Sequence, residues 1–250
     1  MKKYLLATLL CFFCLIVFSQ KNQLLEIPTS SGEIKIQPIL HATMAIHFDG
    51  KIIYTDPYGG VEAFKNIAKP DLILITDIHG DHMNVETLKS LDLGNTPIIA
   101  PKAVADIVAK DFPGVSILAN GASTQMLGIK IEAVPMYNLP DDENSRHPKG
   151  RGNGYVLTLG TKRIYICGDT EDIPEMRELE NIDIAFVCMN QPYTMTIESA
   201  ASAVLEFQPK IVYPFHYRGK GGFSDVNLFK SLVNNQNSNI DVRLVEWYPE

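Results

Sequence analysis

The sequence predicts an α/β fold in which two β-sheets pack together and helices cover their outer faces. Apolar runs of strand length cluster in both halves of the chain, and in each half they lead into an alternation of strands and helices. No low-complexity linker separates the halves. We therefore expect a single domain over residues 20–250, preceded by an N-terminal leader over residues 1–19.

The first half begins with strand-like runs and continues with strand–helix alternation. Strands are expected at 33–40, 43–48 and 51–55, and the Asp49-Gly50 pair between the last two is a hairpin turn signal. A short helix is expected at 61–68, ended before Pro70. The pattern then predicts strands at 72–75 and 97–100, and helices at 85–91 and 103–110.

The second half repeats this order loosely. Strands are expected at 115–118, 123–127 and 129–136, and a long polar segment at 138–153 then interrupts them. A hairpin around Gly160-Thr161 would join strands at 155–159 and 163–167. After it the pattern predicts buried strands at 184–189 and 211–213, helices at 197–207 and 226–233, and a final strand at 242–247.

The N-terminus has the layout of a secretory signal peptide. Lys2 and Lys3 precede an uncharged apolar run at 5–18, and Ser19 is a small residue suited to a cleavage site. A run of about fourteen residues is short for a membrane span, which needs ~20. We expect cleavage before Gln20, export to the periplasm or medium, and no stable membrane span afterwards. An uncleaved membrane anchor is the alternative.

The overall composition limits the classes of partner that the protein could bind. The net charge of −7 and pI near 5.4 argue against a nucleic-acid-binding protein, which needs a basic face. Beyond the leader only Cys167 and Cys188 remain, both in apolar runs. In an exported protein they could form one disulfide, and two buried free thiols are the other interpretation.

Four side chains able to bind a metal ion lie within six residues directly after an apolar run. The run is 71–75, and the four residues are Asp77, His79, Asp81 and His82. A short apolar run is typical of a buried strand, so these side chains would converge at a strand end, where they could hold a divalent cation. The alternative is a polar loop in which Asp81 caps the following helix.

Two further residues follow apolar strands in the same way. Asp169 lies in Gly168-Asp169-Thr170, and His216 lies in Pro214-Phe215-His216-Tyr217. Each is weak alone, because turns and structural histidines are common after strands. Together with the 77–82 loop, three strand ends would supply six ligands, enough for two ions that share a bridging carboxylate and a water molecule.

These residues, in this order, resemble the metallo-β-lactamase superfamily of metal-dependent hydrolases. That family carries Thr-His-x-His-x-Asp-His, then a third His, a bridging Asp and a final His. The resemblance covers about residues 34–247. The framework looks most like the family's ascorbate-phosphate-lactonase-like branch; it comprises Leu40-His41-Ala42, Tyr54-Thr55-Asp56-Pro57, Gly154-Tyr155-Val156, Gly168-Asp169-Thr170 and Pro214-Phe215-His216-Tyr217.

The resemblance implies a four-layer αββα sandwich, the metallo-β-lactamase fold, with two metal ions. His79 would bind the first ion, here called metal 1, and Asp169 would bridge both ions. Metal 2 would be bound by Asp81, His82 and His216. His41 and Asp56 would orient these ligands from behind. For His41, a purely structural role is an equal alternative.

Two residues depart from the family's pattern, both at metal 1. Asp77 stands in place of the first His, and Asn138 in place of the third. A carboxylate can still bind, as a harder donor that suits Mn²⁺ or Mg²⁺ better than imidazole does, whereas Asn offers only a neutral carbonyl. We expect the 137–153 segment to fold over the site with His147 as a surrogate ligand or a proton donor. A loop histidine facing substrate or solvent is the alternative.

The predicted activity is hydrolysis. Water activated by one or two divalent ions, zinc first and manganese or magnesium as alternatives, would attack an ester, lactone, phosphodiester or amide, with Asp81 also orienting the nucleophile. The sequence has no Gly-x-Ser-x-Gly elbow that would indicate a serine nucleophile.

Basic residues near His147 and His216 bear on the substrate. They are Arg146, Lys149, Arg151, Arg218 and Lys220. If their loops overhang the metals they favour a small anionic substrate; otherwise they are solvated surface residues. The rival hypothesis is a non-catalytic ligand- or metal-binding protein on the same fold, with a degenerate first site.

Overall fold

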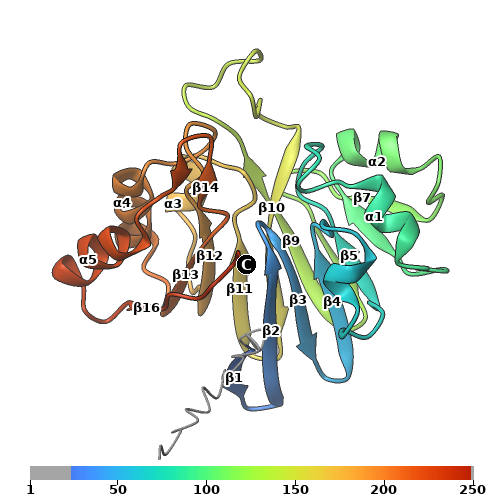
Figure 1. Cartoon of the computed structure of the whole chain (residues 1–250). Helices are drawn as coiled ribbons and strands as arrows, with labels where there is room; N and C mark the ends of the chain where they lie inside the picture. The colour runs from blue at the N-terminus through green and yellow to red at the C-terminus, as the bar shows by residue number, and fades with distance from the viewer. Residues whose placement is uncertain (1–23, 249–250) are drawn as a thin grey trace, which may run out of the picture.

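Two seven-stranded sheets form the centre of the protein (Figure 1). The computed structural model describes residues 24–248, so the expected signal peptide at 1–19 lies outside the described residues. Within 24–248, no helix has the length and apolar character needed to cross a membrane.

The first sheet contains the strands of the first half in sequence order. They are β1 (Leu25–Thr29), β2 (Gly32–Leu40), β3 (Thr43–Phe48), β4 (Lys51–Thr55), β5 (Leu72–Leu74), β6 (Ile98–Ala100) and β7 (Val115–Ile117). β1 to β4 are antiparallel, and β4 to β7 are parallel. Asp49 and Gly50, both with positive φ, make the tight turn between β3 and β4.

The second sheet has the order β16-β13-β12-β11-β10-β9-β8. Its strands are β8 (Ser123–Met126), β9 (Ile129–Met136), β10 (Gly152–Leu159), β11 (Lys162–Ile166), β12 (Ile184–Cys188), β13 (Ile211–Phe215) and β16 (Asp241–Val242). β8 to β11 are antiparallel, and β11, β12, β13 and β16 are parallel. Both sheets thus change from antiparallel to parallel pairing.

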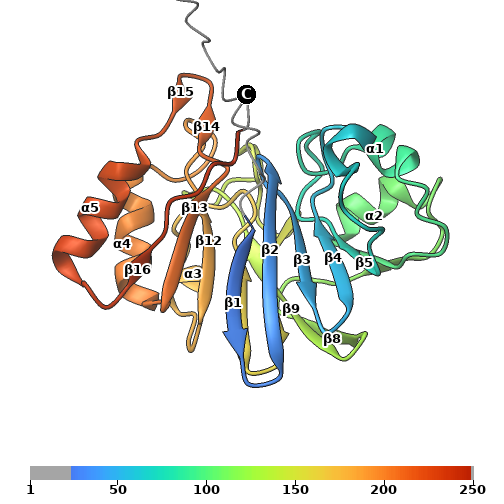
Figure 2. The same cartoon turned by 60° about the horizontal axis from the view of Figure 1, so that its bottom comes forward.

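Alternation along the strands separates the layers. Leu72 and Leu74 of β5 pack into the core between the sheets, whereas Ile73 faces the core under the first helices. That outer layer contains the 3₁₀ helix η1 (Val61–Phe64), α1 (Val85–Ser90) and α2 (Lys102–Val108). On the far side, α3 (Pro174–Arg177), α4 (Ile197–Phe207) and α5 (Val226–Gln236) cover the second sheet (Figure 2). The predicted four-layer αββα sandwich is confirmed.

Several local predictions were wrong. The helix expected at 61–68 is only the four-residue η1. Phe64 is its one buried side chain, so a longer helix would gain little stability from packing. The strand expected at 242–247 pairs only over β16. β1, α3 and the small hairpin of β14 (Arg218–Gly219) and β15 (Gly222–Phe223) were not predicted.

Two alternatives left open by the sequence are also decided in the structure. Asn84, and not Asp81, caps α1: its side chain accepts a hydrogen bond from the Thr87 amide at 2.8 Å. Cys167 and Cys188 are buried free thiols, and the Cys188 amide donates to Cys167 Sγ at 3.2 Å.

Candidate metal centre

The predicted ligands come together where strands of both sheets end. The 77–82 loop follows β5 of the first sheet, and Asp169 and His216 follow β11 and β13 of the second. The long β9–β10 connection adds His147. Three groups of histidine and aspartate side chains have ligand atoms within 4.8 Å of one another: His82, Asp169 and His216; Asp77, His79 and His147; and His41, Asp81 and His216.

Asp169 lies at the centre of the cluster. Its Oδ2 is 3.3 Å from both His82 Nε2 and His147 Nε2, and its Oδ1 is 3.3 Å from His216 Nε2. Burial acts to raise the pKa of Asp169, but the electrostatic influence of His82 and His216 and the close approach of His147 outweigh it and hold the pKa well below its usual value. Asp169 is therefore an ionised carboxylate in contact with histidines of both expected sites.

His82, His216 and Asp81 form one half of the cluster, the expected metal 2 site. His82 is fully buried, and its Nδ1 is 2.8 Å from Asp56 Oδ2. Asp56 is itself fixed by the Thr76 amide and hydroxyl, which donate at 2.7 and 2.6 Å. A carboxylate that accepts Nδ1–H directs Nε2 at the cluster, which is how carboxylates orient metal-binding histidines.

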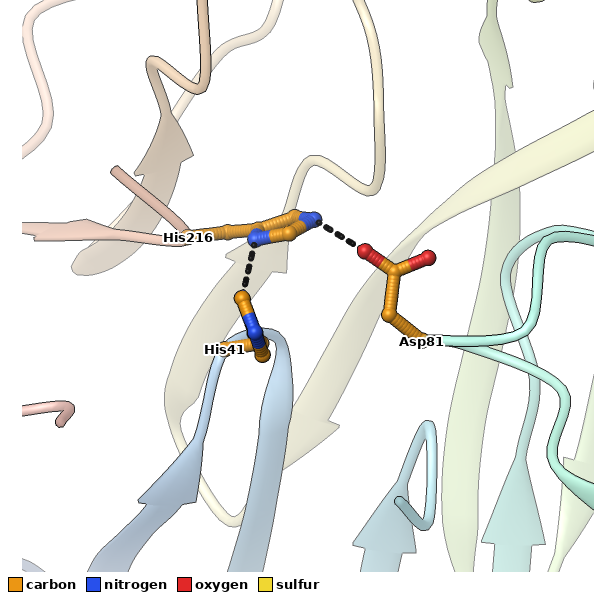
Figure 3. A group of neighbouring side chains, drawn as sticks. All are labelled: His41, Asp81 and His216. Atoms are coloured by element: carbon orange, nitrogen blue, oxygen red, sulfur yellow. Dashed lines mark hydrogen bonds and ion pairs between the residues drawn. The ribbon is translucent and has the colours of Figure 1, made fainter. Parts of the chain in front are cut away.

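His216 lies between His41 and Asp81 (Figure 3). Its Nε2 is 3.4 Å from Asp81 Oδ2, and its Nδ1 is 3.3 Å from His41 Nδ1. Arg218 donates to His41 Nε2 at 2.6 Å. Burial and the charges of His216 and Arg218 lower the pKa of His41 to about 4, so His41 is neutral at pH 7. His41, Asp56 and His216 all have left-handed backbones, with φ of 54°, 44° and 44°.

Asp77, His79 and His147 form the other half, the expected metal 1 site. Asp77 Oδ2 is 2.7 Å from His79 Nδ1 and 4.0 Å from His147 Nε2. Burial acts to raise the pKa of Asp77, but the His79 hydrogen bond and the charges of His82, His79 and Arg151 outweigh it and lower the pKa to about 2. Asp77 is thus ionised across the physiological range.

Asn138 does not face the cluster as a ligand; it holds His147. Its Oδ1 accepts from the His147 amide at 2.9 Å and from His147 Nδ1 at 3.1 Å, while its Nδ2 donates to the Tyr193 carbonyl at 2.9 Å. Because Nδ1 carries the proton in that bond, Nε2 of His147 keeps its lone pair. The expected lid segment therefore places His147, completely buried, beside Asp77 and Asp169.

The buried atoms of the cluster fit divalent cations. Among the described residues, four of them have no hydrogen-bond partner of normal geometry: His79 Nδ1, His82 Nε2, His147 Nε2 and Asp169 Oδ1. Unpartnered buried polar atoms are costly, and ions bound among these side chains would satisfy all four. The donor set of imidazole nitrogens and carboxylate oxygens suits zinc, and also manganese.

Sequence reasoning missed two residues. Arg151 was considered only as a basic loop residue, yet it forms a two-pronged ion pair with Asp77, Nε to Oδ1 at 3.1 Å and Nη2 to Oδ2 at 3.0 Å. Asn190, whose Nδ2 is 3.3 Å from His216 Nε2, was not considered. Neither pairing has a signal in the sequence, because each joins distant segments through loops.

Residues 35–216 match the model of the beta-lactamase superfamily domain, which spans every residue of the cluster. The chain belongs to this superfamily. The match confirms the predicted family, while the ascorbate-phosphate-lactonase-like branch stays a prediction.

Relatives support the same placement. A UPF0173 metal-dependent hydrolase of Pyrococcus abyssi is 32% identical over 214 residues, covering 80% of this chain and 92% of the relative. Another from Lysinibacillus sphaericus is 29% identical over 213 residues, covering 81% and 92%. A crystal structure from Parabacteroides distasonis, described as that of a proposed metal-dependent hydrolase, is 39% identical with a TM-score of 0.81, covering 91% of this chain and 100% of that one.

Proposed function

We propose that this superfamily member is an exported hydrolase that uses two divalent ions, zinc first, to cleave an ester, lactone, phosphodiester or amide of a small anionic substrate. One observation carries the proposal: buried, unpartnered atoms of His82, His147 and Asp169 converge from both sheets and the β9–β10 connection. The names of the relatives agree with a metal-dependent hydrolase.

Bound ions would lower the pKa of a water molecule and polarise the group it attacks. The protein's part is to hold ligands in place and keep them in the right protonation state. Asp56 and Asn138 fix the ring orientations of His82 and His147 through their Nδ1 atoms. Asp169 contacts histidines of both halves and would help to hold both ions.

Asp81 is the carboxylate best placed to orient the attacking water. Its side chain is 35% exposed, whereas those of Asp77 and Asp169 are almost completely buried. Burial raises its pKa, but the His216 hydrogen bond and the nearby histidine charges dominate and keep the pKa well below the usual value. Asp81 is therefore an ionised acceptor that substrate and water can reach.

Of the two roles considered for His147, the geometry favours the ligand. A proton donor to the leaving group needs contact with substrate and a proton on the atom that faces it. His147 is completely buried, its Nδ1 proton is used by Asn138, and its free Nε2 faces Asp169. We assign His147 to metal 1, in place of the imidazole that Asn138 cannot supply.

Two arginines beside the cluster support an anionic substrate. Among the described residues neither has a carboxylate partner: Arg218 contacts His41 and stacks over the Tyr248 ring, and Arg146 stacks over the Tyr193 ring at 4.4 Å. Lys149 and Arg151, by contrast, are paired with Glu175 and Asp77. Unpaired guanidinium groups attract carboxylates and phosphates.

The test begins with metal content. Protein reconstituted with zinc is expected to hold two ions per chain by elemental analysis and to hydrolyse at least one member of a panel of esters, lactones, phosphodiesters and amides.

Anionic members of the panel should be preferred over uncharged analogues, and Arg218→Met should raise KM about 10-fold for the anionic members. Lys102→Met, on α2, is the matched control and should leave KM unchanged. Two bound ions without any hydrolysis, or no bound ion, would favour the ligand-binding alternative.

Export is tested separately. Native protein isolated from its source is expected to begin near Gln20, because the Lys2-Lys3 pair, the short apolar run and Ser19 are typical of a cleaved signal. N-terminal sequencing of the extracellular or periplasmic fraction checks this. Intact Met1 in a cytoplasmic fraction would contradict export and leave the hydrolase proposal standing.

A further inference from the structure

Asp77 stands where the family's pattern has its first histidine, and Arg151 forms an ion pair with it. Asp77 is completely buried, and Arg151 donates one hydrogen bond to each of its carboxylate oxygens, at 3.1 and 3.0 Å. The Arg151 side chain is itself only 18% exposed. Such fork-to-fork geometry fixes the plane of a carboxylate as well as neutralising it.

We propose that Asp77 and Arg151 work as one unit, a charge-neutral oxygen donor that replaces an imidazole at metal 1. An imidazole ligand is neutral, whereas an aspartate adds one negative charge to a site that already contains Asp169, in a two-ion centre that also contains Asp81. The Arg151 guanidinium cancels that charge. Each carboxylate oxygen has two lone pairs, so Asp77 Oδ2 can accept from Arg151 and still face the ion position between His79 and His147.

The placement of Arg151 along the chain supports this assignment. It lies four residues after His147, in the same β9–β10 connection. One segment therefore brings both the substitute imidazole and the cation that neutralises the substitute carboxylate. Arg151 is then a positioning residue, acting on the ion through Asp77. A lysine would supply the charge without the fork.

A simpler explanation is that the pair only ties the connection to the 77–82 loop. The two explanations differ in what happens when Asp77 is changed. If the pair is only a tie, losing either partner has the same effect on metal 1. If it is a neutral donor, the arginine left behind by Asp77→His is an unpaired cation beside the ion, and removing it should restore binding.

The experiment is a double-variant cycle read by zinc titration calorimetry, and it rests on the proposed two-ion site. Asp77→His should weaken binding of the ion at metal 1 by about 10-fold or more, although it restores the family's histidine. Asp77→His combined with Arg151→Met should return the affinity to within about 3-fold of wild type. Lys149→Met, which breaks a neighbouring ion pair of the same connection, should leave both ions bound as in wild type.

Thermal unfolding of Arg151→Met gives an independent readout. Without metal this variant should unfold at a lower temperature than wild type, because the buried Asp77 carboxylate loses its arginine and keeps only His79 beside it. Zinc should then raise its Tm by more than it raises that of wild type, since the ion must do the neutralising. Arg151→Lys should fall between the two.

Three outcomes would overturn the unit: tight binding at metal 1 in Asp77→His alone, no recovery in the double variant, or a zinc-induced Tm rise in Arg151→Met no larger than in wild type. If wild type itself binds only one ion, the proposed two-ion site fails. Two ions in wild type with no recovery in the double variant contradict only the pairing of Asp77 with Arg151.

Discussion

Replacing His82 or His216 by alanine is expected to abolish tight metal binding. Both side chains are almost completely buried, and both direct Nε2 at Asp169 from 3.3 Å. A lost imidazole leaves metal 2 with two terminal ligands at most and strips Asp169 of a neighbour, and removing one ligand of a closed site commonly costs several kcal/mol. Zinc titration calorimetry on each variant measures the loss.

The chain supplies its own control for this experiment. His47, on β3, is the one histidine of six outside the cluster, so His47→Ala should bind two ions as wild type does. Asp77→Ala should still bind one ion, because the ligands of metal 2 are untouched. Equal loss in His82→Ala, His216→Ala and Asp77→Ala would show that the division into two sites is wrong.

His147→Ala should lose the ion at metal 1 and reduce kcat by ~10²-fold or more. The ring is completely buried, and His147 is the imidazole grouped with Asp77 and His79. Metal counting and steady-state kinetics on the same preparation distinguish the two roles considered for this residue. A variant that keeps both ions and loses only kcat would mean that His147 is a proton donor.

Asn138→Leu tests the residue that orients His147 and does not itself face the ion. It leaves the imidazole in place and removes the acceptor that orients it, Oδ1 at 3.1 Å from Nδ1. Loss of such an outer partner typically weakens metal binding by 10- to 100-fold. A weakening smaller than that of His147→Ala is expected. No change at all would show that the loop holds His147 without the help of Asn138.

The layers could be predicted because hydrophobic pattern and turn signals act locally. β9 was predicted with its correct bounds, and the Asp49-Gly50 turn joins β3 and β4 as expected. What failed depends on distant partners. β1 is a strand because β2 pairs along its whole length, and the pairing of β16 with β13 ends where the Arg243 amide donates to the Val212 carbonyl at 3.0 Å.

The site divides in the same way. Ligands at strand ends could be predicted, because each one follows an apolar run, and the end of that run marks the end of the strand. The placement of Asn138 and Arg151 could not, because both contacts are made across the 137–153 segment by hydrogen bonds and charge. Contacts made by loops produce no repeating hydrophobic pattern in the sequence, so pattern analysis cannot predict them. The segment's length and polarity predicted that it could fold back, but not which side chains would meet.

His41 and His216 have left-handed backbones, and at these two positions the residue that favours thermostability differs from the residue that activity needs. A non-glycine residue pays about 1–2 kcal/mol for that conformation, and glycine adopts it freely. A library selected only for resistance to heat, without metal, would therefore enrich glycine at both positions and lose the imidazoles. Directed evolution of this scaffold should screen for bound zinc at every round, since its most stable descendants would be inactive.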